Sequence, residues 1–264
     1  MGVLNVTPDS FSDGGQFYDE EDAVSQGLRL AGQGADIIDI GGESTRPGSK
    51  PVSAEEEKAR TLSVIERLAE RVDIPISIDT QKAEVAAEAL DAGAAVVNDV
   101  SALRTDGDMA SLIAERNVPI CLMHMQGTPR TMQKDPAYEE VVSDIIQWLR
   151  ERVDYAVSAG IDEEQIIVDP GFGFGKTLQH NLELLRRLSE FHSLGRPVLV
   201  GTSRKSMLGA ILGADPDERL NGTLATVVCA AMSGCHIVRV HDVRPARETL
   251  KICQAVRQGI CYRG

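Results

Sequence analysis

Short apolar runs that end in polar residues recur eight times along this chain. Each run is apolar on both faces and rich in Val and Ile, which is typical of strands in a parallel sheet that is covered on both sides. Each is followed by a loop and a helix-like stretch, and several of these stretches close on Gly as a C-terminal cap. The eight runs read VLNVT, DIIDIGG, PISIDT, AVVNDVS, PICLMHM, IIVDPG, PVLVGTSRK and HIVRVHD.

The polar strand ends decide between two architectures. A doubly wound open sheet would show the same alternation of strands and helices, but it concentrates its chemistry at one switch point. Here nearly every strand ends in a polar residue, which favours an α/β fold closed into a (β/α)8 TIM barrel with its site on the C-terminal rim. At 264 residues the chain has the size of one barrel. We therefore expect a single domain over residues 1–264.

Composition narrows the classes of partner and compartment. The net charge of −13 opposes binding to nucleic acid or to an anionic membrane surface. The five cysteines are odd in number and show no CxxC spacing, so buried free thiols in a reducing compartment are expected. No apolar run approaches the length of a membrane span, and the first residues lack the pattern of a signal peptide. These features predict a cytoplasmic protein.

Carboxylate and amide side chains at three strand ends predict a pocket for a planar heterocycle. Asp79 and Asp169 each end an apolar strand, and acceptor-only groups suit the N–H edge of a ring with amino and lactam groups. Asn98 lies between them in chain order and can join the same set. Asp39 also ends a strand, but the plainer interpretation, a cap for the following helix, is strong there.

The stretch DPGFGFGKT follows the sixth run and superficially resembles a phosphate-binding loop. Such a loop needs a Gly five positions before the Gly of GK, and that position is Pro170. The motif therefore fails. We interpret the glycines as allowing the backbone and Phe174 to approach a ligand closely, with an ordinary flexible turn as the alternative.

Residues of the seventh, eighth and first strands predict an anion site. The run GTSRKSMLGAIL joins a strand end to a helix, and Lys205 adds a positive charge beside two serine hydroxyls. Arg239 and His241 are two residues apart, so their side chains face the same way and can share one anion. On the adjacent first strand, Asn5 can supply an oxygen to a bridging Mg2+. His124 ends the fifth strand but is as easily structural, and the histidine spacing argues against zinc.

Taken in order, these motifs resemble the dihydropteroate synthase family. The resemblance runs from Asn5 to about Val243 and rests on long stretches of the chain. They are NVTPDSFSDGG at 5–15, GGESTRPG at 41–48, SIDT at 77–80, NDVS at 98–101, LMHMQGTP at 122–129, DPGFGFGK at 169–176, SRKS at 203–206 and RVHD at 239–242.

The resemblance implies an alkyl-transferring enzyme of folate biosynthesis. It would condense (7,8-dihydropterin-6-yl)methyl diphosphate with 4-aminobenzoate, releasing diphosphate and forming 7,8-dihydropteroate. Sulfonamide inhibitors bind the aminobenzoate pocket in this family. A homodimer built from late helices is implied as well, and the apolar circumference of the stretch 219–234 agrees with it. Members usually carry a further segment before the first strand, which here begins almost at Met1, so a shortened chain or an incomplete start is expected.

Roles for individual residues follow from the same resemblance. The pterin would be held by Asp79, Asn98, Asp169 and Lys205, with Met123 and Gly201 beside them. The diphosphate and Mg2+ would be held by Asn5, Arg239 and His241. The aminobenzoate pocket would be bordered by Thr45, Arg46, Pro47, Phe174, Lys205 and Ser206. Catalysis is expected from Asp79, Lys205, Phe11, Asp13 and Arg46, the loop residues among them excluding water.

The chemistry fits these residues without a covalent intermediate. Metal and cationic donors help diphosphate to leave, and Asp79 can stabilise the cation left on the pterin methylene carbon. Two alternatives stay open, which are a non-catalytic pterin-binding homologue and an isomerase with a late-strand phosphate site. Diphosphate release with and without 4-aminobenzoate distinguishes them.

Overall fold

A computed structural model describes residues 1–7, 20–44 and 48–259 of the chain. The strands are β1 (Gly2–Asn5), β2 (Ile38–Gly41), β3 (Ile76–Asp79), β4 (Val96–Asp99), β5 (Ile120–Met123), β6 (Ile166–Asp169), β7 (Leu199–Val200) and β8 (Ile237–Val238). The α-helices are α2 (Glu20–Gly32), α3 (Ala54–Ala69), α4 (Ala83–Asp91), α5 (Met109–Arg116), α6 (Val141–Ser158), α7 (Leu178–Arg186), α8 (Ser206–Leu212), α9 (Leu220–Met232) and α10 (Val243–Gln258). The 3-10 helices are η1 (Glu163–Gln165), η2 (Leu188–Leu194) and η3 (Pro216–Glu218).

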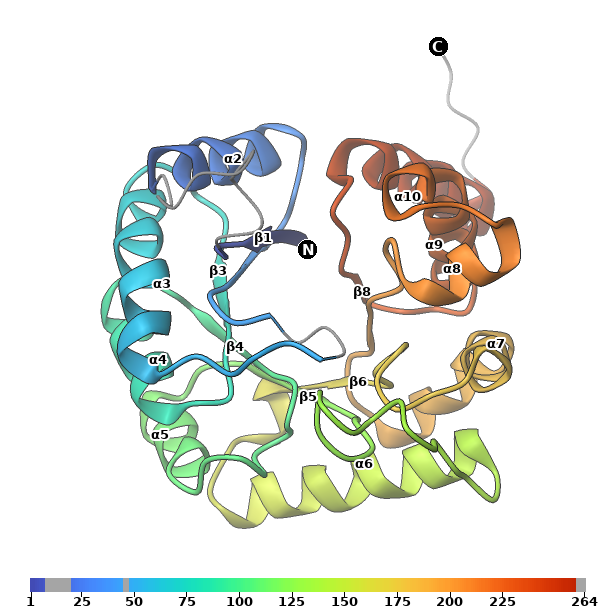
Figure 1. The fold of residues 1–264 in the computed structure, drawn as a ribbon, viewed down its shortest axis with the longest axis horizontal. Coiled ribbons are helices and arrows are strands. Elements are labelled where there is room, and N and C mark those ends of the chain that lie inside the picture. The colour runs from blue at the N-terminus through green and yellow to red at the C-terminus, as the bar shows by residue number, and fades with distance from the viewer. Residues whose placement is uncertain (8–19, 45–47, 260–264) are drawn as a thin grey trace.

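The parallel strands lie inside a ring of helices (Figure 1). Strands β1 to β6 pair in chain order, and β7 pairs with β8. Two isolated parallel bridges join these sheets, Val168 with Val198 and Gly2 with Val240. At the second bridge the Val3 N–H donates to the Val240 carbonyl over 3.0 Å. The predicted (β/α)8 barrel is therefore confirmed.

The strand register brings the polar strand ends to one level of the barrel. Asn5 pairs with Gly41, Gly41 with Asp79, and Asp79 with Asn98, so four consecutive strands end side by side. Further round the ring, Met123 pairs with Asp169. Because all the strands are parallel, these residues share the C-terminal rim, where barrel enzymes build their sites.

Both faces of the strands are buried. Ile38, Ile40, Ile76 and Ile78 share one face and are at most 2% exposed, and Asp39 and Ser77 on the other face are 0% exposed. Helix starts are also set by sequence, as at α3, where the Ser53 side chain accepts from the Glu56 N–H over 3.2 Å. No helix in the described ranges is long and apolar enough to cross a membrane.

Candidate active site

One arginine joins two strand-end carboxylates at the centre of the rim. Arg239, just after β8, donates from Nε to Asp39 Oδ2 over 2.6 Å and from Nη2 to Asp79 Oδ2 over 2.8 Å. Burial raises the pKa of Asp79 above its usual range, and the Arg239 charge opposes that rise. Although burial works in the other direction, Asp39 and Asp79 together raise the pKa of Arg239. The cluster therefore holds two carboxylates against one guanidinium.

Asp39 belongs to this cluster, which corrects its interpretation as a helix cap. Its carboxylate is completely buried, and Oδ2 also accepts from Asn98 Nδ2 over 3.1 Å. The following helix is capped by Ser53 instead. Asp39 Oδ1 has no partner among the described residues, although it lies in the interior. The signal that identified Asp79, an acid at the end of an apolar strand, applied equally to Asp39.

Asp169 and Lys205 form the second half of the rim. Asp169 is buried, and its Oδ1 accepts from the Gly171 N–H over 2.7 Å. Burial raises its pKa, and Lys205 is the strongest opposing charge. Burial also lowers the pKa of Lys205 to about 8, against the effect of Asp169. The Lys205 ammonium donates to the Phe172 carbonyl and lies 4.7 Å from the centroid of the Phe174 ring.

Side chains from other parts of the chain form hydrogen bonds with most of the peptide groups in the loop 171–175. Gly173 donates its N–H to Asn181 Oδ1 over 2.7 Å, and Tyr138 Oη donates to the Gly175 carbonyl over 2.7 Å. Gly171 has φ of +70°, and a Cβ there would lie 1.9 Å from the His124 carbonyl oxygen, so no other residue fits. These bonds indicate a loop that is held in place and not an ordinary flexible turn, and its approach to a ligand stays a prediction.

Lys176, which the sequence did not single out, anchors this loop from below. It is 3% exposed and donates from Nζ to the carbonyls of Gly171 and Phe174 over 2.8 and 2.9 Å. Its third partner is His124 Nδ1 at 2.9 Å. His124 therefore has a structural contact, one of the two alternatives that the sequence left open. The only signal for Lys176 was a lysine directly after a glycine-rich run.

The end of the seventh strand is organised by Ser203. Its Oγ accepts from the His241 backbone N–H over 3.2 Å and lies 3.0 Å from His241 Nδ1. Arg204 follows with φ of +57° and makes a two-point ion pair with Asp242 at 3.0 and 2.8 Å. The predicted pairing of Arg239 and His241 on a common anion stays a prediction, because here Arg239 contacts carboxylates and His241 contacts Ser203.

The other predicted residues occupy the same rim or lie outside the described ranges. Asn5 ends β1, Ser206 begins α8, Met123 packs near Phe174, and Gly201 lies between Arg239 and Lys205. The residues outside the described ranges are Phe11, Asp13, Thr45, Arg46 and Pro47.

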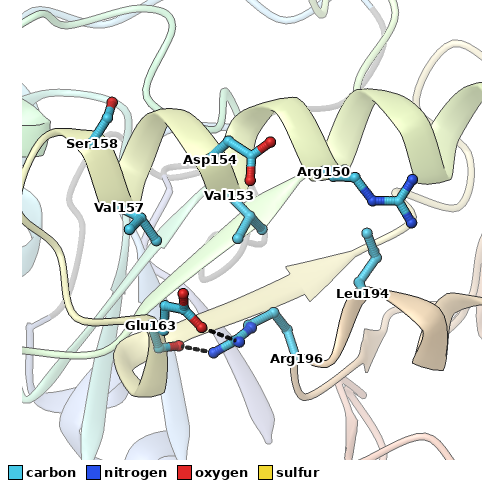
Figure 2. Close-up of a pocket in the computed structure, with 8 residues that line it drawn as sticks. All are labelled: Arg150, Val153, Asp154, Val157, Ser158, Glu163, Leu194 and Arg196. Atoms are coloured by element: carbon cyan, nitrogen blue, oxygen red, sulfur yellow. Dashed lines mark hydrogen bonds and ion pairs between the residues drawn. The ribbon is translucent and has the colours of Figure 1, made fainter.

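A separate surface pocket of about 390 Å3 lies at the opposite end of the barrel (Figure 2). It lies between α6 and the segments that precede β6 and β7, and Arg196 donates there to the Glu163 carboxylate over 2.5 Å. It contains none of the strand-end residues. The polar rim, and not this pocket, is therefore the candidate active site.

Comparisons with known sequences and structures identify the family of this chain. A model of the family described as pterin binding enzyme matches residues 1–241. The chain belongs to this family. Dihydropteroate synthase of Escherichia coli (strain K12) is 49% identical over 255 residues, which are 97% of this chain and 90% of that protein. These matches confirm the resemblance carried by the motifs.

Solved structures of family members agree over the whole barrel. The dihydropteroate synthase of Yersinia pestis, in a sulfonamide drug complex, aligns with a TM-score of 0.93 at 47% identity, covering 97% of this chain and 93% of that one. The Xanthomonas albilineans enzyme with 4-aminobenzoic acid aligns with a TM-score of 0.92 at 46% identity, covering 98% and 93%. Both the family and the fold are thus shared along nearly the full chain.

Proposed function

We propose that the strand-end rim condenses (7,8-dihydropterin-6-yl)methyl diphosphate with 4-aminobenzoate, giving 7,8-dihydropteroate and diphosphate. The observation that carries this proposal is the 49% identity to the Escherichia coli dihydropteroate synthase over 97% of the chain. The geometry supports it, because Asp79, Asn98 and Asp169 lie on one rim with Arg239 and Lys205. The reaction transfers an alkyl group to an amine.

The pterin ring binds against the buried acids. Asp79 and Asp169 are acceptor groups suited to ring N–H donors, and Asn98 offers both an acceptor and a donor. Lys205 lies beside Asp169 and supplies an N–H donor to an acceptor atom of the ring. Since these groups are already desolvated, their interactions with the ring are stronger than they would be in water.

The diphosphate binds where Arg239 and His241 leave β8. A guanidinium has five N–H donors, and the two carboxylates engage only Nε and Nη2 of Arg239. The same side chain can therefore also receive a diphosphate oxygen. Its positive charge then stabilises the negative charge that builds up on the departing diphosphate.

Mg2+ fits this site as an ion bound mainly by the substrate diphosphate, and not as one bound only by protein side chains. The described part of the chain contains no group of three His, Cys, Asp or Glu side chains that could hold a metal ion. Mg2+ commonly binds one or two protein oxygens together with substrate phosphates and water, and the Asn5 side-chain oxygen provides such a ligand. When bound, the ion would neutralise charge on the diphosphate. Sulfonamides would compete for the aminobenzoate pocket.

No nucleophilic side chain is needed for this reaction. As the C–O bond to diphosphate breaks, positive charge develops on the pterin methylene carbon, and the Asp79 carboxylate stabilises it. The aminobenzoate nitrogen then attacks that carbon and loses a proton. Phe174 and Lys205 border the aminobenzoate, and they orient it for attack.

The test is an assay of diphosphate release from the pterin substrate. We expect release that depends on 4-aminobenzoate and yields 7,8-dihydropteroate in equal amount. Binding of the pterin without turnover would support a non-catalytic homologue. Release that is indifferent to 4-aminobenzoate, or conversion without diphosphate release, would contradict the proposed reaction.

Exposed apolar side chains on the last two helices support a homodimer. Met232 on α9 is 48% exposed, and Ile252 and Val256 on α10 are 67% and 65% exposed. They line a shallow groove of about 410 Å3 between these helices. Water contact with so many grouped apolar side chains is unfavourable, and a second copy would cover them.

The four described cysteines are free thiols, which supports a reducing compartment such as the cytoplasm.

A further inference from the structure

The His124–Lys176 pair lies directly beneath the substrate-facing loop. Lys176 is almost fully buried, and its ammonium has three acceptors, which are the Gly171 and Phe174 carbonyls and His124 Nδ1. Burial lowers the pKa of Lys176 well below its usual value, and Asp169 opposes that shift. The three acceptors around Nζ match the three N–H donors of the ammonium form, so these partners use all of them. Lys176 therefore has no donor left for a substrate and acts on its surroundings.

The two carbonyls belong to the loop that holds Lys205. Between them, the Phe172 carbonyl accepts from the Lys205 ammonium, and the Phe174 ring lies against the same ammonium at 4.7 Å. Lys176 ties both ends of this short segment to one point. Any shift of the segment would move the carbonyl and the ring that fix Lys205.

His124 connects this anchor to the barrel. Its backbone N–H donates to the Asp169 carbonyl over 2.9 Å, so it joins the ends of β5 and β6. The ring packs edge-on against Trp148, with centroids 4.8 Å apart. Burial, reinforced by Lys176, lowers the pKa of His124 well below its usual value. A neutral imidazole is the form whose Nδ1 can accept from Lys176.

We propose that His124 and Lys176 are positioning residues that lock the loop 171–175, so that Phe172 and Phe174 hold Lys205 between the two substrates. This inference rests on the proposed function of the rim. Neither residue touches substrate; both act through the loop. Loosening the loop should impair the binding of aminobenzoate, which Phe174 and Lys205 border, more than the chemical step.

Two substitutions of nearly equal size separate this role from general packing. His124→Asn places an amide oxygen near the position of Nδ1 and can still accept from Lys176. His124→Leu cannot, and it leaves the buried Lys176 ammonium short of an acceptor. Both variants lose the ring contact with Trp148 and have the same number of side-chain heavy atoms, so their comparison tests the acceptor for Lys176.

Steady-state kinetics of the full-length protein provide the readout. Relative to wild type, we expect His124→Leu to raise the KM for 4-aminobenzoate about tenfold or more, with a smaller change in kcat. His124→Asn should stay within about threefold of wild type. Equal values for Asn and Leu would overturn the proposal. A wild-type protein that forms no dihydropteroate would contradict the proposed function instead.

A double-mutant cycle tests whether the pair acts through Phe174. If it does, adding Phe174→Ala to His124→Leu should cost little beyond the larger single effect. Multiplicative effects would overturn the proposal. Should His124→Leu fail to fold, His124→Gln replaces it, because its amide oxygen lies nearer the position of Nε2 than of Nδ1. A Gln variant with the kinetics of Asn would then overturn the role of Nδ1, and one with a raised KM would support it.

Discussion

Arg239 is expected to have two roles in this site. It forms ion pairs with Asp39 and Asp79, and it is also the cation expected to bind the diphosphate. Two carboxylates facing one guanidinium leave net negative charge at the place where the pterin cation forms. The charge of Asp79 is therefore available to the reaction, although an arginine contacts it.

Asp79→Asn should lower kcat about 100-fold or more while changing pterin affinity much less, because the lost charge matters most in the transition state. Initial rates and direct titration of the pterin measure the two effects. Asp39→Asn is the control, since Asp39 contacts the same arginine but is fully buried. Loss of pterin binding with kcat preserved would contradict the role of Asp79, and equal losses in both variants would make it structural.

The ionisation of Lys205 should determine how kcat/KM falls at basic pH. The pKa of Lys205 is lowered to about 8 by burial, and only the protonated ammonium can give the pterin a hydrogen bond strengthened by positive charge. As the pH rises through about 8, the free enzyme loses that proton, so kcat/KM should fall. On the acidic side, kcat/KM should fall at a pH above the usual range of a carboxyl group, because the pKa of Asp79 is raised. Lys205→Met should lack the basic limb; a variant that keeps it would assign the limb to another group.

At the scale of elements, a partly buried ion cluster connects α3 with the segments that follow β2 and precede α4. Lys82, before α4, donates over 2.5 Å both to Glu57 on α3 and to Glu43, which follows β2. The Glu57 side chain is only 1% exposed, and its Oε1 has no partner among the described residues. The cluster holds Glu43, which precedes Thr45, Arg46 and Pro47 in the sequence.

Lys82→Met should lower the free energy of unfolding by about 2 kcal/mol, because it leaves the Glu57 carboxylate buried without a counter-charge. This value lies below the usual range for a buried pair, since a quarter of the Lys82 side chain is exposed. Urea denaturation measures the change. Lys58→Met is the matched control: its partners Glu84 and Glu88 are more than half exposed, so little change is expected. Similar losses in both variants would show that the Glu57 contact contributes nothing special.

At the scale of the whole molecule, the groove between α9 and α10 predicts self-association. We expect sedimentation at micromolar concentration to show a dimer, and Ile252→Glu to shift it towards monomer by placing a charge in the interface. Ile211→Glu on α8 is the control, because Ile211 is 54% exposed but lies outside the groove. A wild-type monomer, or equal dissociation by both variants, would contradict this interface.

The two substrates should bind in a fixed order. Asp79, Asn98 and Asp169, proposed for the pterin, belong to strand ends held by the barrel register, whereas Arg46 and Pro47, proposed for the aminobenzoate pocket, come several positions after the end of β2. Bound pterin and diphosphate would provide negative charge for Arg46 to bind, and this would complete that pocket. Calorimetry should detect 4-aminobenzoate binding only when pterin with diphosphate is present. Equal affinity for the empty protein would show a pocket already formed on the strand ends.

The sequence by itself determined the architecture and the level at which the site lies. Apolar runs buried on both faces specify parallel strands, and the polar residue that ends each run must then face the rim, so Asp79, Asn98 and Asp169 could be found by pattern alone. The long motifs determined the family, because each residue that contacts a substrate must have the chemical group and size that the contact requires.

Only the tertiary structure decided which of these side chains contact one another. Asp39 and Arg239 are 200 residues apart, and no local pattern distinguishes an acid that pairs with an arginine from one that caps a helix. Lys176 similarly depends on an acceptor, directly after β5, that is 52 residues away. Periodicity reports the face on which a residue lies, whereas ion pairs and pKa shifts depend on distance and burial, which closure of the barrel sets.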